Sequence, residues 1–153
     1  MKNEPITAMD KKANQYDSPT EYLILMDKKN HILGVYRGKD SSRERVFYCI
    51  CTLGAPQTPT PSGSFLLGSY DGLPFHWRHF DAEGTGMRCW WATRFAPGGY
   101  LIHSVLYIPS SSPEQISDGR LGADVSHGCI RLEIDNAKWI YDNVPEKSRC
   151  VIY

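Results

Sequence analysis

The sequence contains no apolar run near the roughly 20 residues that a helix needs to span a bilayer. It also lacks an excess of either charge, because 17 Lys and Arg balance 17 Asp and Glu in 153 residues. A chain with this balance has no surface suited to following a phosphate backbone, which argues against a nucleic-acid binder. Hydrophobic residues make up 41% of the chain, enough for the packed core of one domain and too many for a disordered protein.

Paired CxxC motifs are also missing. The five cysteines are an odd number, so at least one thiol cannot pair within the chain. Cys49 and Cys51 are two residues apart, which suits neither a mutual disulfide nor, alone, a zinc site. We expect them to be buried core thiols.

His76 and His79 form an HxxH pair, a spacing that can hold zinc on a helix. No third ligand is evident, and Pro74 together with nearby glycines favours a loop here. The sequence therefore predicts packed or solvated histidines, with substrate contact as the other reading, and no metal site.

The first 18 residues are polar, without periodicity and without the apolar segment of a secretory signal. They are predicted to be a flexible lead-in to a single domain over residues 19–153. We see no repeat and no internal domain boundary.

The pattern of the remaining residues predicts a mainly β domain with one C-terminal helix. Ala137, Ile140, Tyr141 and Val144 share one helical face. Residues 54–63 carry three prolines and form a stiff loop, while residues 68–89 and 108–124 are predicted to be long irregular loops. Strands are predicted over residues 21–26, 31–36, 45–53, 64–67, 90–95, 100–107 and 148–153.

The strongest chemical signal is the segment SHGCIR, residues 126–131. A thiol such as that of Cys129 becomes a strong nucleophile only as the thiolate, so it needs a base or a cation nearby. His127 is two residues away, a separation of about 6–7 Å on an extended chain that rarely allows a hydrogen bond. We therefore favour His103, on a predicted strand, as the base, and expect His127 to shape the site. The alternative is a core cysteine with structurally satisfied histidines.

Three segments together resemble the L,D-transpeptidase catalytic domain, the YkuD-like family of peptidoglycan enzymes. They are SHGCIRL at residues 126–132, TPTPSGSF at residues 58–65 and LIHS at residues 101–104. The resemblance implies a β-sandwich with one helix after the cysteine motif, over residues 21–153. Two departures are a 22-residue spacer between His103 and Ser126, longer than the short form of the family pattern, and Arg131, where that pattern often has Asn.

The resemblance implies that Cys129 forms a thioester with a tetrapeptide stem of peptidoglycan, and that a second stem attacks it to give a 3–3 crosslink. His103 would be the base, and the backbone carbonyl of Ser104 would orient its ring. The Gly128 and Cys129 amides would stabilise the oxyanion.

For the other site residues we expect three roles. His127 would hold the motif loop in shape, and Arg131 would either steady that loop or bind a substrate carboxylate. Ser126 and Tyr100 are expected to contact substrate.

No cofactor is implied, and the expected partners are peptidoglycan stem peptides and β-lactams of the carbapenem class, which would acylate Cys129. An L,D-carboxypeptidase or another cell-wall peptide hydrolase that uses the same Cys–His pair is the main alternative. A wall-binding module without activity is a third hypothesis. We expect a location in the cell envelope outside the cytoplasm, with an export signal or anchor that is not part of this chain.

Overall fold

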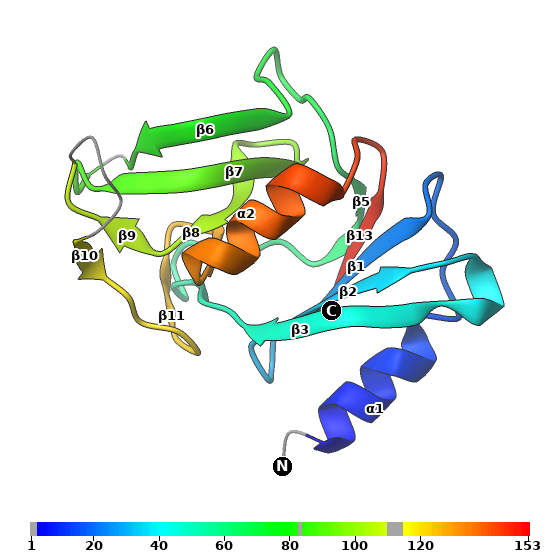
Figure 1. The fold of residues 1–153 in the computed structure, drawn as a ribbon. Coiled ribbons are helices and arrows are strands. Elements are labelled where there is room, and N and C mark those ends of the chain that lie inside the picture. Colours follow the sequence, from blue (N-terminus) through cyan, green and yellow to red (C-terminus); the bar gives the residue numbers. More distant parts are fainter. Residues whose placement is uncertain (1–2, 83, 110–114) are drawn as a thin grey trace.

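The computed structural model describes residues 3–82, 84–109 and 115–153. These residues form two large β-sheets and a third of two strands, with one helix between the large sheets and a second helix on the outer face of the first (Figure 1). The two helices are α1 (Asn3–Lys12) and α2 (Ile134–Asn143), and a single 3-10 turn, η1, spans Asp40–Ser42. None of the described helices is long and apolar enough to cross a membrane. A mainly β fold with a helix after the cysteine motif is thus confirmed.

The first sheet has five strands, and the last strand of the chain lies inside it. Its order is β3 (Glu44–Ile50), β2 (Ile32–Arg37), β1 (Tyr22–Asp27), β13 (Arg149–Ile152) and β5 (Gly63–Leu66). β1 and β13 are parallel, whereas the other neighbours in this sheet are antiparallel.

The second sheet carries most of the candidate site. Its six strands are β10 (Ile116–Asp118), β9 (Leu106–Tyr107), β7 (Arg88–Ala96), β8 (Tyr100–Ser104) and β12 (Ile130–Leu132), with β6 (His76–Asp81) also paired to β7. A short parallel pair, β11 (Asp124–Ser126) with β4 (Leu53–Gly54), lies beside it.

β1 explains how the layers are held together. All six of its residues are buried, so the strand reads as a continuous apolar run rather than as an alternation. Ile24 and Met26 face the core between the two sheets, whereas Leu23 and Leu25 face helix α1. Both faces of this sheet are therefore covered (Figure 1).

Helix α2 joins the two sheets through aromatic contacts. The Trp139 ring meets Phe47 of the first sheet edge-on, with centroids 5.3 Å apart. Tyr141 stacks on His76 at 4.1 Å and meets Trp91 at 5.2 Å, both in the second sheet. Because the helix follows β12 directly, this packing also fixes the strand that leads away from Cys129.

The prediction of a flexible lead-in is wrong for residues 3–12, which form α1. Ile6 and Met9 are buried against the outer face of the first sheet, and the Tyr36 hydroxyl donates a hydrogen bond to Asp10 at 2.6 Å. The helix is ten residues long with few apolar side chains, so its periodicity is weak in the sequence.

Residues 68–89 are not one irregular loop, because they contain the edge strand β6 and the start of β7. β6 pairs with β7 from His76, opposite Thr93, to Asp81, opposite Arg88. Its polar and aromatic side chains do not alternate cleanly, so the strand pattern is hidden. Residues 108–124 likewise contain β10, and residues 110–114 of that predicted loop lie outside the described residues.

All five cysteines are free thiols. Cys51, Cys89 and Cys150 are fully buried and Cys49 is half-buried. Burial raises the pKa of the Cys49 thiol to about 12. The expectation of a buried core thiol is confirmed for Cys51, whereas Cys49 is only half-buried and packs against the core.

Candidate functional site

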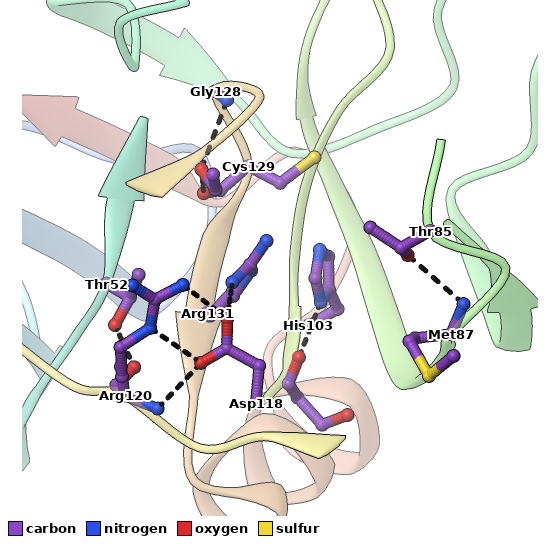
Figure 2. Close-up of polar contacts among 11 residues, drawn as sticks. Thr52, Thr85, Met87, His103, Asp118, Arg120, Gly128, Cys129 and Arg131 are labelled. Atoms are coloured by element: carbon purple, nitrogen blue, oxygen red, sulfur yellow. Dashed lines mark hydrogen bonds and ion pairs between the residues drawn. The ribbon is translucent and has the colours of Figure 1, made fainter. Parts of the chain in front are cut away.

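Cys129 and His103 come from neighbouring strands and line the same cavity. Cys129 lies between β11 and β12, and its side chain projects toward β8, which carries His103 (Figure 2). β12 and β8 are parallel, with Arg131 opposite His103. The cavity has a volume of about 480 Å³, and Cys129, His103 and Arg131 are all among its lining residues.

The His103 ring is held in one orientation by the backbone. Its Nδ1 lies 2.6 Å from the Ser104 carbonyl oxygen, which can only accept a hydrogen bond. Nδ1 therefore carries the proton, and Nε2 is the basic nitrogen. Burial lowers the pKa of His103 to about 4; the hydrogen bond to Ser104 opposes this effect, and the charge of Arg131 adds to it. The ring is neutral at pH 7.

The Cys129 thiol is also uncharged at rest. Burial raises its pKa, and three groups partly oppose that effect: the Leu101 amide and the guanidinium groups of Arg131 and Arg94. The sulfur lies 3.9 Å from the Gly99 carbonyl oxygen, a distance that allows the thiol to donate a weak hydrogen bond. The site thus combines a neutral thiol with a neutral imidazole.

The Ser126 hydroxyl ties the loop around Cys129 together. It accepts a hydrogen bond from the Gly128 amide at 3.1 Å and donates one to the Cys129 carbonyl at 2.6 Å. Gly128 has a φ of +116°, and a Cβ there would lie 2.5 Å from the Tyr100 ring, so only glycine fits. Of the two amides predicted to stabilise an oxyanion, that of Gly128 is occupied within the loop.

Three of the predicted site residues, His127, Tyr100 and Ser126, differ in how they lie relative to the cavity. His127 is exposed at the rim of the cavity. The Tyr100 ring packs beside Gly128 and is not among the cavity-lining residues. Both contacts of the Ser126 hydroxyl are within the loop. Substrate contact by Ser126 and Tyr100 stays a prediction.

Sequence reasoning missed Arg94, a second cation in the cavity wall. Its side chain is only 1% exposed, its Nε donates to the Pro74 carbonyl at 2.7 Å, and the Trp77 ring lies 4.8 Å from its guanidinium carbon. Its Nη2 has no hydrogen-bond partner among the described residues. The signal in the sequence is a lone arginine inside the apolar segment WWATRFA.

A chain of ion pairs connects Arg131 to the spacer loop. Arg131 Nη1 lies 3.4 Å from Asp118 Oδ2, and Arg120 makes two closer hydrogen bonds to the same carboxylate, at 2.9 and 2.7 Å (Figure 2). The Arg120 hydrogen bond is the main reason that the pKa of Asp118 falls to about 2. The Thr52 hydroxyl donates to the Arg120 carbonyl, which joins this loop to the strand region after β3.

The aromatic and histidine residues of β6 and β7 divide between packing and cavity. Trp90 is buried and Trp91 packs on the core. Trp77 lines the cavity instead. His76 and His79 lie on β6, where His76 stacks on Tyr141. The described residues contain no cluster of three His, Cys, Asp or Glu able to hold a metal ion.

Comparison with known proteins finds a matching family and a curated relative. The L,D-transpeptidase catalytic domain (YkuD) family matches residues 21–152. A curated relative, the putative L,D-transpeptidase YciB of Bacillus subtilis, is 32% identical over 112 residues, which are 70% of this chain and 55% of the relative. The chain thus spans about half the length of that relative.

Solved structures share the fold. A fused Zn-dependent amidase, peptidase and peptidoglycan-binding domain protein of Clostridium acetobutylicum is 34% identical with a TM-score of 0.75, over 96% of this chain and 59% of that one. The L,D-transpeptidase LdtMt1 in complex with imipenem is 26% identical with a TM-score of 0.63, over 87% of this chain and 59% of that one.

Proposed function

The chain belongs to the L,D-transpeptidase catalytic domain family, and from that membership we propose that it forms 3–3 crosslinks in peptidoglycan by cysteine acyl transfer. One observation carries the proposal: Cys129 and His103 line the same cavity, and the Ser104 carbonyl holds the His103 ring with Nε2 free to accept a proton. A thiol nucleophile with an oriented base is the arrangement that acyl transfer requires.

In the first step the Cys129 sulfur attacks the carbonyl of residue three in a donor tetrapeptide stem. The thiol proton passes to His103 Nε2 as the carbon–sulfur bond forms, because a neutral thiol is a poor nucleophile. The bond to the terminal D-alanine then breaks, and His103 returns the proton to the leaving amine. The product is a thioester on Cys129.

In the second step the side-chain amine of another stem attacks the thioester. His103 takes a proton from that amine, the carbon–sulfur bond breaks, and the sulfur regains the proton. A low pKa suits His103 to this role, since the ring must be unprotonated at the start of each step. If water replaces the amine, the same residues hydrolyse the thioester and the enzyme is an L,D-carboxypeptidase.

Arg131 has two proposed roles. Its contact with Asp118 supports steadying the spacer loop, whereas its place in the cavity wall supports binding a substrate carboxylate. Extracytoplasmic location in the cell envelope follows from the proposed substrate. Acylation by carbapenems is proposed too, with support from the related enzyme that binds imipenem.

Intact-protein mass spectrometry tests the function directly. Wild type and Cys129→Ala are incubated with imipenem and, separately, with muropeptides that carry tetrapeptide stems. We expect an imipenem adduct on the wild type alone, together with loss of D-alanine and formation of muropeptide dimers.

Other outcomes separate the alternatives. Loss of D-alanine without dimers would establish the carboxypeptidase instead. A folded, reduced wild type that forms no adduct and turns over no muropeptide would contradict the proposal and favour a wall-binding domain.

A further inference from the structure

The Thr60 hydroxyl lies against the loop that carries Cys129. Thr60 is only 1% exposed and belongs to the proline-rich segment 54–63. Its Oγ1 lies 3.0 Å from the Gly54 amide and 2.9 Å from the Gly128 carbonyl oxygen. The amide can only donate a hydrogen bond, and the carbonyl can only accept one. The hydroxyl proton is therefore directed at Gly128.

The peptide plane after Gly128 connects that hydrogen bond to the reactive sulfur. The Gly128 carbonyl and the Cys129 amide belong to one trans peptide unit, so they point in opposite directions. A hydrogen bond that fixes the carbonyl therefore also fixes the direction of the Cys129 N–H. That N–H has no acceptor among the described residues, whereas the neighbouring Gly128 amide is occupied by Ser126.

We propose that Thr60 is a positioning residue that aims the Cys129 amide at the oxyanion formed during acylation. The inference rests on the proposed acyl transfer by Cys129. An oxyanion donor is effective when its direction is set before the reaction, because no free energy is then spent on reorganisation. Thr60 provides that constraint from outside the SHGC motif.

The support under Thr60 is itself rigid. Pro59 and Pro61 flank it, which restricts its backbone. The Lys28 ammonium donates to the Thr60 carbonyl, and a Cβ at Gly54 would lie 2.7 Å from the Thr60 nitrogen. The loop is thus packed directly against the backbone at Gly54 and cannot shift without disturbing it.

Thr58 offers a matched control two residues away. Its hydroxyl donates to the Ser126 carbonyl at 2.9 Å, and that carbonyl also accepts a hydrogen bond from the Ala55 amide at 2.8 Å. The amide in the same peptide unit belongs to His127, not to Cys129. Loss of the Thr58 hydroxyl therefore removes a similar hydrogen bond without releasing the Cys129 amide.

Two reactions of Cys129 separate positioning from general structure. Acylation by p-nitrophenyl acetate passes through an oxyanion, whereas alkylation by iodoacetamide does not. Both are measured on wild type, Thr60→Val, Thr60→Ser and Thr58→Val, with Cys129→Ala as the background. Melting temperatures confirm that each variant is folded.

We expect Thr60→Val to lower the acylation rate constant about 10- to 100-fold, somewhat less than the loss of an oxyanion donor. Its alkylation rate stays within about twofold of wild type, because the thiol and its base are unchanged. Thr60→Ser restores acylation to near the wild-type rate, and Thr58→Val leaves both reactions unchanged.

Two results would overturn the role of Thr60: unchanged acylation in Thr60→Val, or an equal fall of acylation and alkylation. Muropeptide turnover by the wild type is measured separately. A protein that does not turn over muropeptides but shows the expected acylation pattern would contradict the proposed function and retain the role of Thr60.

Discussion

At the scale of single residues, Cys129 and His103 differ from a preformed thiolate–imidazolium pair. Burial favours the neutral form of both groups, and it acts in opposite directions on their pKa values: it raises that of the thiol and lowers that of the imidazole to about 4. Arg131 stabilises an anionic sulfur but destabilises a cationic ring. The charge separation therefore forms as substrate is attacked.

This resting state predicts the pH dependence of alkylation. The iodoacetamide rate at Cys129 should rise about tenfold per pH unit from pH 6 to 8.5 without a plateau, since only the thiolate reacts and the pKa is raised. For acylation, His103 should remain neutral, and so able to accept a proton, down to about pH 5, because the pKa of His103 is about 4. Stopped-flow or mass-spectrometric rates across this range check both profiles. A plateau of alkylation between pH 5 and 7 would instead indicate an ion pair.

The two proposed roles of Arg131 predict different kinetic effects for substitutions at Arg131 and Asp118. Asp118→Asn removes the carboxylate that links Arg131 to the spacer loop while leaving the arginine in the cavity wall. If Arg131 binds a substrate carboxylate, we expect Arg131→Lys to raise KM at least about tenfold, since a bidentate fork is lost, with little change in Asp118→Asn. Muropeptide kinetics of the two variants decide this. A similar loss in both variants would identify Arg131 as a support of the loop.

The sequence predicts the residues whose roles depend on local spacing. Cys129 stands out in the SHGC segment, and His103 is favoured over His127 as the base because i and i+2 neighbours on a strand rarely share a hydrogen bond. Thr60 and Arg94 could not be assigned in the same way. Their roles depend on hydrogen bonds and packing between segments 20 to 68 residues apart, which no local pattern contains.

At the scale of secondary structure, strands were predictable where they are continuously apolar. β1 is buried throughout and β13 is buried except at Arg149, and both appear plainly in the sequence. β6 is a half-exposed edge strand, and β11 and β12 are three residues each, so their pairing partners define them more than their composition does. The site was harder to predict than the core because it lies on these short elements.

A substitution in the buried face of helix α1 should lower the stability of the protein without affecting the cavity around Cys129. Met9 is fully buried against the outer face of the first sheet. Met9→Ala should lower the free energy of unfolding by about 2–4 kcal/mol, through lost burial and the cavity left behind. Chemical denaturation measures this, with the exposed Lys11→Ala as a control expected to change little. Cys129 alkylation should be unchanged; a slower rate would show that α1 also affects the site.

At the scale of the whole molecule, the loop around Cys129 is the point where distant parts of the chain meet. β11, before Cys129, pairs with β4, and β12, after it, pairs with β8. Thr52 bridges to Arg131 beside the same loop. Helix α2 then returns the chain to the core, and β13 completes the first sheet. The position of Cys129 therefore depends on correct assembly of both sheets.

The burial of His103 in this assembly makes the stability of the whole fold depend on pH. Between pH 6.5 and 4 the unfolded chain protonates His103 while the folded protein does not, so the unfolded state binds more protons and the unfolding free energy falls as pH falls. For a folded pKa of about 4, the loss from this residue should reach about 2 kcal/mol at pH 5. His103→Gln removes the titrating group, so its unfolding free energy should fall by about that much less between pH 7.5 and 5. His76 also has a pKa lowered by burial and remains in both proteins, so the difference between them isolates His103. Urea denaturation at the two pH values measures it, and equal losses in wild type and variant would show that His103 is not buried in its neutral form.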